Sequence, residues 1–177
     1  RSRYGKEWLI GDTLNSGIGQ GYVLASPLQL AVMTARVATG RAVDPRIVRS
    51  LNDRDEPLAE APPLGINENH LRAVRGGMFA VMNGSHGTAR ASRIADDTLA
   101  MCGKTGTSQV RNISAAERAS GVISNDDLPW GRRDHALFVC YAPADAPRIA
   151  VSLIVEHGGG GSAAAAPIAR DILLQAL

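Results

Sequence analysis

The sequence has little of what nucleic-acid-binding or membrane-spanning proteins need. Aromatic residues make up 4% of its 177 residues, the net charge is only +2, and lysine and arginine form no block. Surfaces for stacking bases or for binding a phosphate backbone are therefore missing, which argues against nucleic acid as a partner. An apolar run such as Ile149–Val155 is far shorter than the roughly 20 residues that cross a bilayer.

Cysteine and histidine are scarce as well. The two cysteines, Cys102 and Cys140, form no C-x-x-C motif, and the four histidines are widely separated along the chain. Neither residue type has the spacing of a metal site, so the sequence predicts no metal in this chain. Both cysteines are expected to be small buried apolar residues, and a disulfide between them stays open.

What remains is typical of one globular domain, since 45% of the residues are apolar and 20% are charged. Ser26-Pro27-Leu28-Gln29 is a capping box that predicts a helix ending at Gly40, and Asn67 is expected to begin a second helix. A last helix is expected from Pro167. The apolar faces are expected at Leu28, Ala31, Val32 and Ala35, at Leu71, Val74, Met78 and Met82, and at Ile168, Ile172, Leu173 and Ala176.

Short apolar runs predict the strands. They are expected at 45–51, 99–110, 134–142 and 148–156, with loops at 1–25 and 52–65. The last two strands are expected to form an antiparallel hairpin. The polar insert 111–133 is longer than most connections between strands, which suggests a mobile or functional loop. Within it, Ser114 is expected to begin a short helix, and Trp130 either contacts a ligand or anchors the loop.

The stretch Gly103-Lys104-Thr105-Gly106-Thr107-Ser108 carries the clearest chemistry. Lys104 brings a positive charge on a flexible stem, and Thr105 and Thr107 lie on the same side of an extended chain. Gly106 lets a ligand approach the backbone, and an edge strand can also pair with an extended peptide. Taken alone, these residues favour an ordinary strand with a solvated lysine and a glycine bulge. In the context of the other motifs, we interpret the stretch as a carboxylate-binding surface.

K-T-G is also the last of three motifs in the serine penicillin-recognising enzymes. A wider resemblance is carried by Gly11-Asp12-Thr13 with Ile18-Gly19-Gln20-Gly21-Tyr22, by Ser26–Ala31, by Gly103–Thr107, by Arg133–Phe138 with Ala142-Pro143, and by Glu156–Gly159 with Ala166–Arg170. These stretches occur in the family's order and cover nearly the whole chain. The sequence thus resembles the transpeptidase domain of class B penicillin-binding proteins, above all the elongation type, penicillin-binding protein 2.

The resemblance implies an α/β (α+β) fold with an antiparallel sheet flanked by helices. Residues 1–177 would be the C-terminal part of one transpeptidase domain, with 111–133 as a long loop. The implied activity is that of a peptidoglycan D,D-transpeptidase, in which a serine is acylated by one stem peptide and an amine of another resolves the acyl-enzyme. Lys104 and Thr107 would be catalytic, the latter through an oxyanion-hole N–H, and Lys104, Thr105, Gly106 and Thr107 would bind substrate.

The nucleophile that the resemblance requires is not in this sequence. No serine is followed by lysine three positions later. Ser50-Leu51-Asn52 fits the second motif, S-x-N, by letters only, because it follows the first helix instead of preceding it. Residues 1–177 alone are therefore expected to be inactive. One sheet edge and an apolar face are expected to be uncovered without the N-terminal half of the same domain.

By the same resemblance, the expected partners are peptidoglycan stem peptides, β-lactams and the cell-wall elongation machinery. The expected location is the periplasmic face of the bacterial inner membrane, with the anchor outside residues 1–177. No cofactor is expected in this chain, and a zinc ion in the upstream half, as in some family members, stays open. Two alternatives remain: a class A or division-type class B enzyme, and an inert transpeptidase-like module that binds a peptide or a partner.

Overall fold

The computed structural model describes residues 5, 7–21, 23–57 and 59–177. The helices are α1 (Ile10–Gly17), α2 (Pro27–Thr39), α3 (Glu68–Asn83), α4 (Ala115–Ser120) and α5 (Ala166–Ala176), and the strands are β1 (Ser50–Leu51), β2 (Arg54–Asp55), β3 (Cys102–Ser108), β4 (His135–Ala142) and β5 (Ile149–Val155). A π-helical turn, Gly161–Ala165, leads directly into α5. Tyr22, part of one stretch that carries the resemblance, lies outside the described residues.

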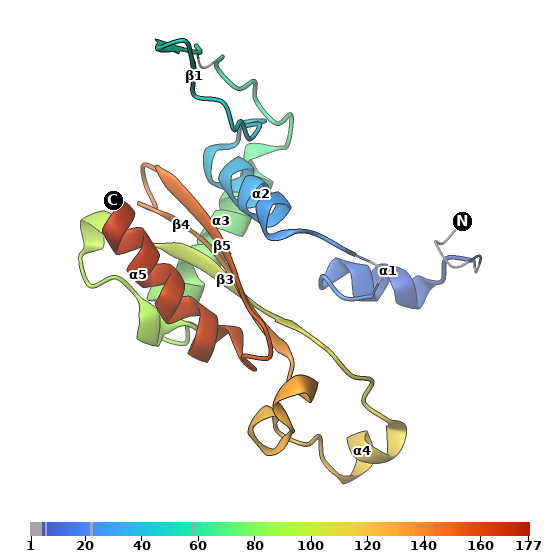
Figure 1. Cartoon of the computed structure of the whole chain (residues 1–177). Helices are drawn as coiled ribbons and strands as arrows, with labels where there is room; N and C mark the ends of the chain where they lie inside the picture. The colour runs from blue at the N-terminus through green and yellow to red at the C-terminus, as the bar shows by residue number, and fades with distance from the viewer. Residues whose placement is uncertain (1–4, 6, 22, 58) are drawn as a thin grey trace.

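The central sheet is antiparallel, with the strand order β3-β4-β5. β3 pairs with β4 from Cys102–Tyr141 to Ser108–His135, and β4 pairs with β5 from Ala136–Val155 to Ala142–Ile149. Figure 1 shows α5 on one face of the sheet, with α2 on the other face and α3 running along β3. The expected hairpin and the expected α/β (α+β) fold are confirmed, with a sheet as small as an incomplete domain should have.

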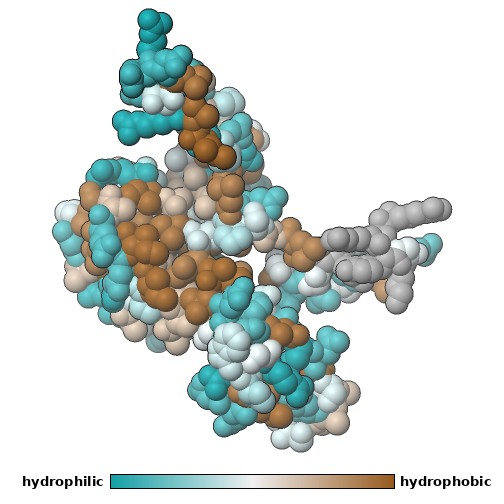
Figure 2. Space-filling model, viewed as in Figure 1, coloured by the Kyte–Doolittle hydropathy of each residue, from teal (hydrophilic) through white to brown (hydrophobic). Residues whose placement is uncertain are grey.

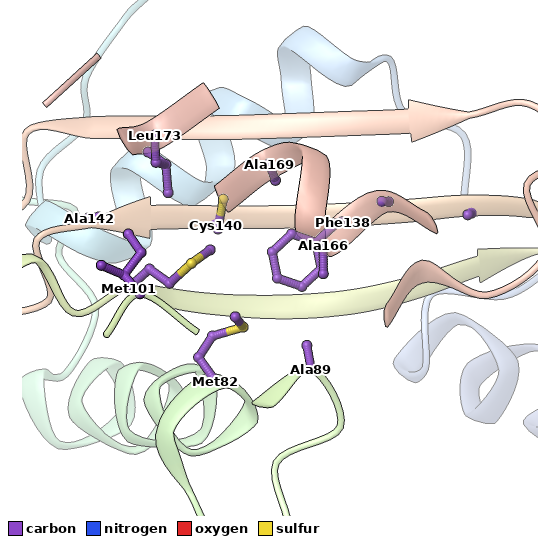
Figure 3. Packing of buried hydrophobic residues seen from close by; sticks show 12 residues of the cluster. Met82, Ala89, Met101, Phe138, Cys140, Ala142, Ala166, Ala169 and Leu173 are labelled. Atoms are coloured by element: carbon purple, nitrogen blue, oxygen red, sulfur yellow. The ribbon is translucent and has the colours of Figure 1, made fainter. Parts of the chain in front are cut away.

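The larger core lies between the sheet and α5. Figure 3 shows Phe138 and Cys140 of β4 beside Ala166, Ala169 and Leu173 of α5. All five side chains are buried. The alanines let the helix backbone come close to the sheet, so the phenyl ring and the leucine fill the space between them.

The buried face of α5 differs from the predicted one. Of the four expected positions only Leu173 is buried, whereas Ile168 and Ile172 are 44% and 41% exposed. The reason is that Ala166, Ala169 and Leu173 share one face at helical spacing and allow a closer approach than a face of isoleucines. The apolar periodicity predicted the helix correctly, but the positions of its large apolar residues predicted the wrong buried face.

α2 shows a similar difference. Its predicted start and stop are confirmed: the side chains of Ser26 and Gln29 form a reciprocal capping box, and Gly40 ends the helix with a left-handed φ of 71°. Its buried positions, however, are Thr34 and Ala38, and Leu28 on the predicted face is 62% exposed. Thr34 is tolerated inside because its hydroxyl donates to the carbonyl of Leu30 at 2.7 Å.

α3 follows the sequence more closely. Asn67 caps it by accepting from the N–H of Asn69 at 2.9 Å. The predicted face is largely buried, through Leu71, Met78 and Met82, while Val74 is 50% exposed. The wider apolar stripe of this helix therefore reaches beyond the surface that the sheet covers.

Two predictions in the N-terminal part were wrong. Gly11-Asp12-Thr13, expected in a loop, lies in α1, where Asp12 accepts from the N–H of Leu9 at 2.9 Å and so caps the first turn. The expected strand 45–51 forms only at Ser50–Leu51, which pairs with Arg54–Asp55 in a separate small hairpin. Among the described residues it pairs with Arg54–Asp55 alone and not with the central sheet, and an isolated two-stranded hairpin is only marginally stable, so the strand stays short.

The insert between β3 and β4 projects beyond the ends of those strands (Figure 1). The helix expected at Ser114 is confirmed as α4, and the Ser114 hydroxyl accepts from the N–H of Glu117 at 3.1 Å. Short 3-10 turns at Asn125–Asp127 and Trp130–Arg132 complete the insert. Among the described residues, no helix has the length and apolar character needed to cross a membrane.

Candidate active site

The K-T-G-T stretch forms most of β3, and β3 is an edge strand. Among the described residues it pairs with β4 only, with Lys104 opposite Val139, Thr105 opposite Phe138 and Thr107 opposite Ala136. The expected strand is confirmed, and its free edge meets the condition for pairing with an extended peptide. That pairing itself stays a prediction.

The lysine and the threonines lie on opposite faces of the sheet. Directly opposed residues of an antiparallel pair share a face, so Lys104 shares the face of Val139, toward α2, and Thr105 shares the face of Phe138, toward α5. Thr107 follows Thr105. The three side chains can therefore act on one ligand only if that ligand runs along the strand's free edge.

A cavity of about 430 Å³ opens beside Lys104. Its walls are side chains of α2 (Met33, Thr34, Val37) and α3 (Val74, Gly77, Met78, Val81), together with Val139 and Lys104 itself. The Lys104 ammonium donates to the carbonyl of Thr105 at 2.6 Å. An exposed lysine thus lines a cavity whose other walls are almost wholly apolar.

Gly106 is held tightly from the α5 side. A Cβ placed on Gly161, in the π-helical turn, would lie 2.3 Å from the carbonyl oxygen of Leu137 and 2.7 Å from that of Gly106. The turn therefore packs directly on the backbone of β3 and β4, which only glycine at position 161 permits. This contact supports the centre of the K-T-G-T stretch.

Side chains also fasten both ends of β3. At its start, the Asn83 amide at the end of α3 donates to the carbonyl of Met101 at 3.0 Å. Beyond its end, the N–H of Val110 donates to Oδ1 of Asp134 at 3.3 Å. Asp134 in turn is held by Asn125, whose Oδ1 accepts from the N–H of Asp134 at 2.8 Å.

Two histidines lie next to this end of the strand. The N–H of His157 donates to Nδ1 of His135 at 2.9 Å, so Nδ1 of His135 carries no proton. His157 Nδ1 faces the carbonyl of Arg133 at 2.9 Å and is therefore the protonated nitrogen of that ring. Trp130, 64% exposed, meets the His157 ring edge-on at 4.5 Å. The tryptophan thus helps to anchor the insert to the sheet.

The network of Asn125, Asp134, His135 and His157 was not singled out as functional from the sequence. The only signal was that Arg133-Asp134-His135 and Glu156-His157-Gly158 belong to stretches that carry the family resemblance. Asn125 had no signal, because it lies in a polar insert where nothing marks its distant partner.

The insert has an internal ion pair. The two terminal guanidinium nitrogens of Arg111 donate to the carboxylate of Glu117, at 2.6 and 2.7 Å, and both side chains are largely buried. The hydrogen bonds from Arg111 are the main reason why the pKa of Glu117 falls from its usual 4.5 to about 2. Glu117 also accepts from the N–H of Ile123 at 3.2 Å, so the pair fixes both sides of α4.

The cysteines are free and buried, as expected for small apolar residues. They lie in different core clusters, Cys102 on the α2 side of the sheet and Cys140 on the α5 side. Burial raises the pKa of Cys102 and raises that of Cys140 to about 12, so both remain thiols at neutral pH. Burial, and a hydrogen bond with Cys102, raise the pKa of Tyr141 as well.

Other sequence candidates are not brought to this strand. Ser50 lies in the separate β1–β2 hairpin, which projects away from the central sheet (Figure 1). Within the part of the chain that the structure describes, no group of three or more His, Cys, Asp or Glu side chains is placed to hold a metal ion.

An antiparallel sheet with a lysine-threonine-glycine edge strand, packed between helices, defines the class of serine penicillin-recognising enzymes. The model of the penicillin binding protein transpeptidase domain matches residues 2–174. The chain belongs to this family, as the sequence resemblance predicted.

Relatives narrow the type. The chain is 36% identical to the peptidoglycan D,D-transpeptidase MrdA of Haemophilus influenzae over 98% of its own length. It matches a structure of Pseudomonas aeruginosa PBP2 in complex with WCK 5153, with 34% identity, a TM-score of 0.75, and coverage of 97% of this chain and 34% of that one. A complex between PBP2 and MreC from Helicobacter pylori gives 31% identity, a TM-score of 0.76, and coverage of 98% and 28%.

These names agree with the penicillin-binding protein 2 type that the sequence resembled. The chain spans about a quarter of the length of the curated relatives that it matches, 27% for the Haemophilus protein.

Proposed function

We propose that residues 1–177 form the K-T-G-bearing part of a peptidoglycan D,D-transpeptidase of the elongation type. The observation that carries this proposal is the position of Lys104-Thr105-Gly106-Thr107 on a free edge strand, beside a cavity, in a chain of the transpeptidase family. The substrate would be a stem peptide that ends in D-Ala-D-Ala, lying along that edge.

In the proposed reaction, a serine hydroxyl attacks the penultimate D-Ala carbonyl, an acyl-serine ester forms, and D-Ala leaves with the serine proton on its amine. An amine of a second stem peptide then attacks the ester, forms the crosslinking amide and restores the serine. The Thr105 and Thr107 hydroxyls would hold the terminal carboxylate, and the Thr107 N–H would donate to the oxyanion. Losing one such donor costs about 10²–10³ in rate.

Lys104 would act from the other face of the strand. Its side chain lines the apolar cavity, where a charge would be poorly screened once the cavity is filled. There it would stabilise negative charge on the reacting serine and on the substrate carboxylate. Since this chain has no S-x-x-K motif, the serine would come from a segment outside residues 1–177, and the chain alone would not turn over substrate.

The cavity and the exposed apolar side chains suggest where the segment that carries the serine would pack. Figure 2 shows that apolar surface lies open on the face of the molecule turned to the viewer. On α2 and α3, the exposed large apolar residues include Leu28, Met33, Val74 and Phe79. Monomeric proteins rarely leave such surfaces open. The N-terminal half of the same domain would cover them and bring its serine to Lys104.

The wider partners follow from the relatives. One matched structure is a complex with MreC, so contact with the elongation machinery is proposed for the whole protein here as well. Stem peptides and β-lactams are the proposed ligands of the site. The proposed location is the periplasmic face of the bacterial inner membrane.

Labelling with fluorescent penicillin tests the proposal, on residues 1–177 alone and on the whole protein. We expect no label on the chain alone and a covalent label on the whole protein, at a serine upstream of Arg1. Lys104→Ala in the whole protein should slow acylation by about 10²-fold or more. A label on residues 1–177 alone would refute the proposal that the serine nucleophile lies outside this segment. No label on a folded whole protein would favour an inert binding module.

A further inference from the structure

The position of β3 depends on how its ends are fastened. Among the described residues, an edge strand such as β3 has ladder hydrogen bonds on one side only, so its far end is free to shift unless other groups hold it. Thr107 is the second-last residue of β3. Val110 lies three residues later, and its N–H is the first backbone group beyond the strand that a side chain holds by a hydrogen bond among the described residues.

That side chain is Asp134, and all of its polar groups are engaged. Oδ1 accepts from the N–H of Val110 at 3.3 Å, and Oδ2 accepts from Nδ2 of Asn125 at 3.4 Å. Its own N–H donates to Oδ1 of Asn125 at 2.8 Å, and its carbonyl accepts from the N–H of Gly159 at 2.9 Å. Asp134 therefore ties the exit of β3, the entrance of β4 and the segment after β5 to one point.

Asn125 sets the orientation of the Asp134 carboxylate. Its side-chain oxygen accepts from the backbone N–H of Asp134, and its side-chain nitrogen donates to the carboxylate of Asp134. It comes from the 3-10 turn in the insert, nine residues before its partner. Gly159 lies beside Asn125, where a Cβ would make only an ordinary contact of 3.5 Å with Cβ of Asn125; its left-handed φ of 78° is what favours glycine there.

From this geometry we infer that Asn125 and Asp134 are positioning residues for the proposed reaction. Together they form a clamp that fixes the Thr107 end of the K-T-G-T strand, and so places the Thr107 N–H and hydroxyl against the substrate. The inference rests on the proposed function of that strand. Neither residue contacts substrate; both act through the backbone of Val110.

The expected size of the effect follows from the distance to the site. Thr107 lies only three residues before Val110, whose N–H the clamp holds. Releasing the clamp should therefore let the Thr107 end of β3 shift by less than the length of one residue along the strand. Misplacing a catalytic group by about 1 Å can cost 10²-fold in rate. We therefore expect loss of the clamp to slow acylation about 10- to 100-fold.

The test uses the whole protein and the kinetics of acylation by fluorescent penicillin. Asn125→Asp keeps the acceptor for the Asp134 N–H but sets two carboxylates against each other. Asp134→Asn keeps an acceptor for Val110 but removes the complementary pair. Each should slow acylation about 10- to 100-fold while the final labelled fraction stays the same. Combining both substitutions restores one amide and one carboxylate and should recover most of the rate.

Ser124→Ala is the matched control. The Ser124 hydroxyl donates to Asp127 within the same turn at 2.8 Å and touches neither end of the insert. It should leave the acylation rate within about twofold. Hydrogen exchange of the Val110 amide should speed up in both single variants and return to normal in the combined one.

The outcomes separate positioning from folding. A lower labelled fraction with an unchanged rate constant would mean that the pair only stabilises the fold, and would overturn the inference. Unchanged rates in both single variants, or no recovery in the combined one, would overturn it too. If the unmodified whole protein is not labelled at all, the proposed function fails first, and the inference falls with it.

Discussion

α1 and α5 are both helices with an apolar side, yet they differ in what that side meets. In α5, Ala166, Ala169 and Leu173 are buried against the sheet. In α1 no residue is buried, and Ile10 and Leu14 are 83% and 69% exposed. The two helices have similar sequence patterns because an apolar face indicates that a helix packs against another surface. It does not indicate which surface that is.

The same contrast holds for the two larger regions around these helices. We call residues 68–108 with 134–177 the body, and residues 5–66 the N-terminal part. Among the described residues of the N-terminal part, only Thr34 and Ala38 are buried, while the remaining buried residues lie in the body or, for Leu128, in the insert. The body therefore has its own core, whereas the N-terminal part has apolar surface without a covering layer in this chain.

Leu173→Ala should have the largest effect, because it removes a fully buried side chain from the core of the body. The whole protein should lose about 2–5 kcal/mol in free energy of unfolding, measured by urea denaturation. Leu174→Ala is the matched control on the same helix, since Leu174 is 47% exposed. Equal losses for the two variants would contradict the packing of α5 described here.

Gly161→Ala should be the next largest. Its methyl group would collide with the backbone oxygens of Leu137 and Gly106, at 2.3 and 2.7 Å, and neither can move without shifting the sheet. Overpacking of this kind costs about 1–3 kcal/mol. Gly160→Ala is the control, because a Cβ there meets nothing within 4 Å. Thermal unfolding of the two variants should separate clearly, and similar melting temperatures would refute the contact.

Leu14→Ala tests the N-terminal part directly. In residues 1–177 alone it should change the free energy of unfolding by no more than about 0.5 kcal/mol, because the side chain is exposed. In the whole protein the same change should cost clearly more if another segment covers α1. Equal, small effects in residues 1–177 and in the whole protein would contradict the idea that another segment covers the N-terminal part, because α1 would then be exposed in the whole protein too.

Acid should weaken the insert by protonating Glu117. The pKa of Glu117 is lowered from 4.5 to about 2 by Arg111, so the carboxylate stabilises the folded insert above pH 4.5. This contribution is lost as the pH falls from 4.5 towards 2. The NMR shift of the Ile123 amide, which donates to Glu117, should titrate with a midpoint near the folded-state pKa of about 2. In Glu117→Gln it should not, and a titration there would assign the change to another group.

Local signals in the sequence determined much of this protein. The capping box at Ser26, the left-handed stop at Gly40, the cap at Asn67 and the β4–β5 hairpin depend on neighbouring residues only, and all were predicted correctly. The order of short motifs identified the family. The chemistry of Lys104-Thr105-Gly106-Thr107 was also evident, and its position on a strand is confirmed, although the roles of the four residues stay predictions.

The tertiary structure decided which faces are buried and which distant groups meet. It buried Thr34 and the alanines of α5 in place of larger residues, because backbone distance to the sheet, and not side-chain size, selects the packed face. It placed Lys104 and the threonines on opposite faces of an edge strand. It also joined Asn125 to Asp134, since a hydrogen bond across nine residues of an irregular insert leaves no periodic pattern in the sequence.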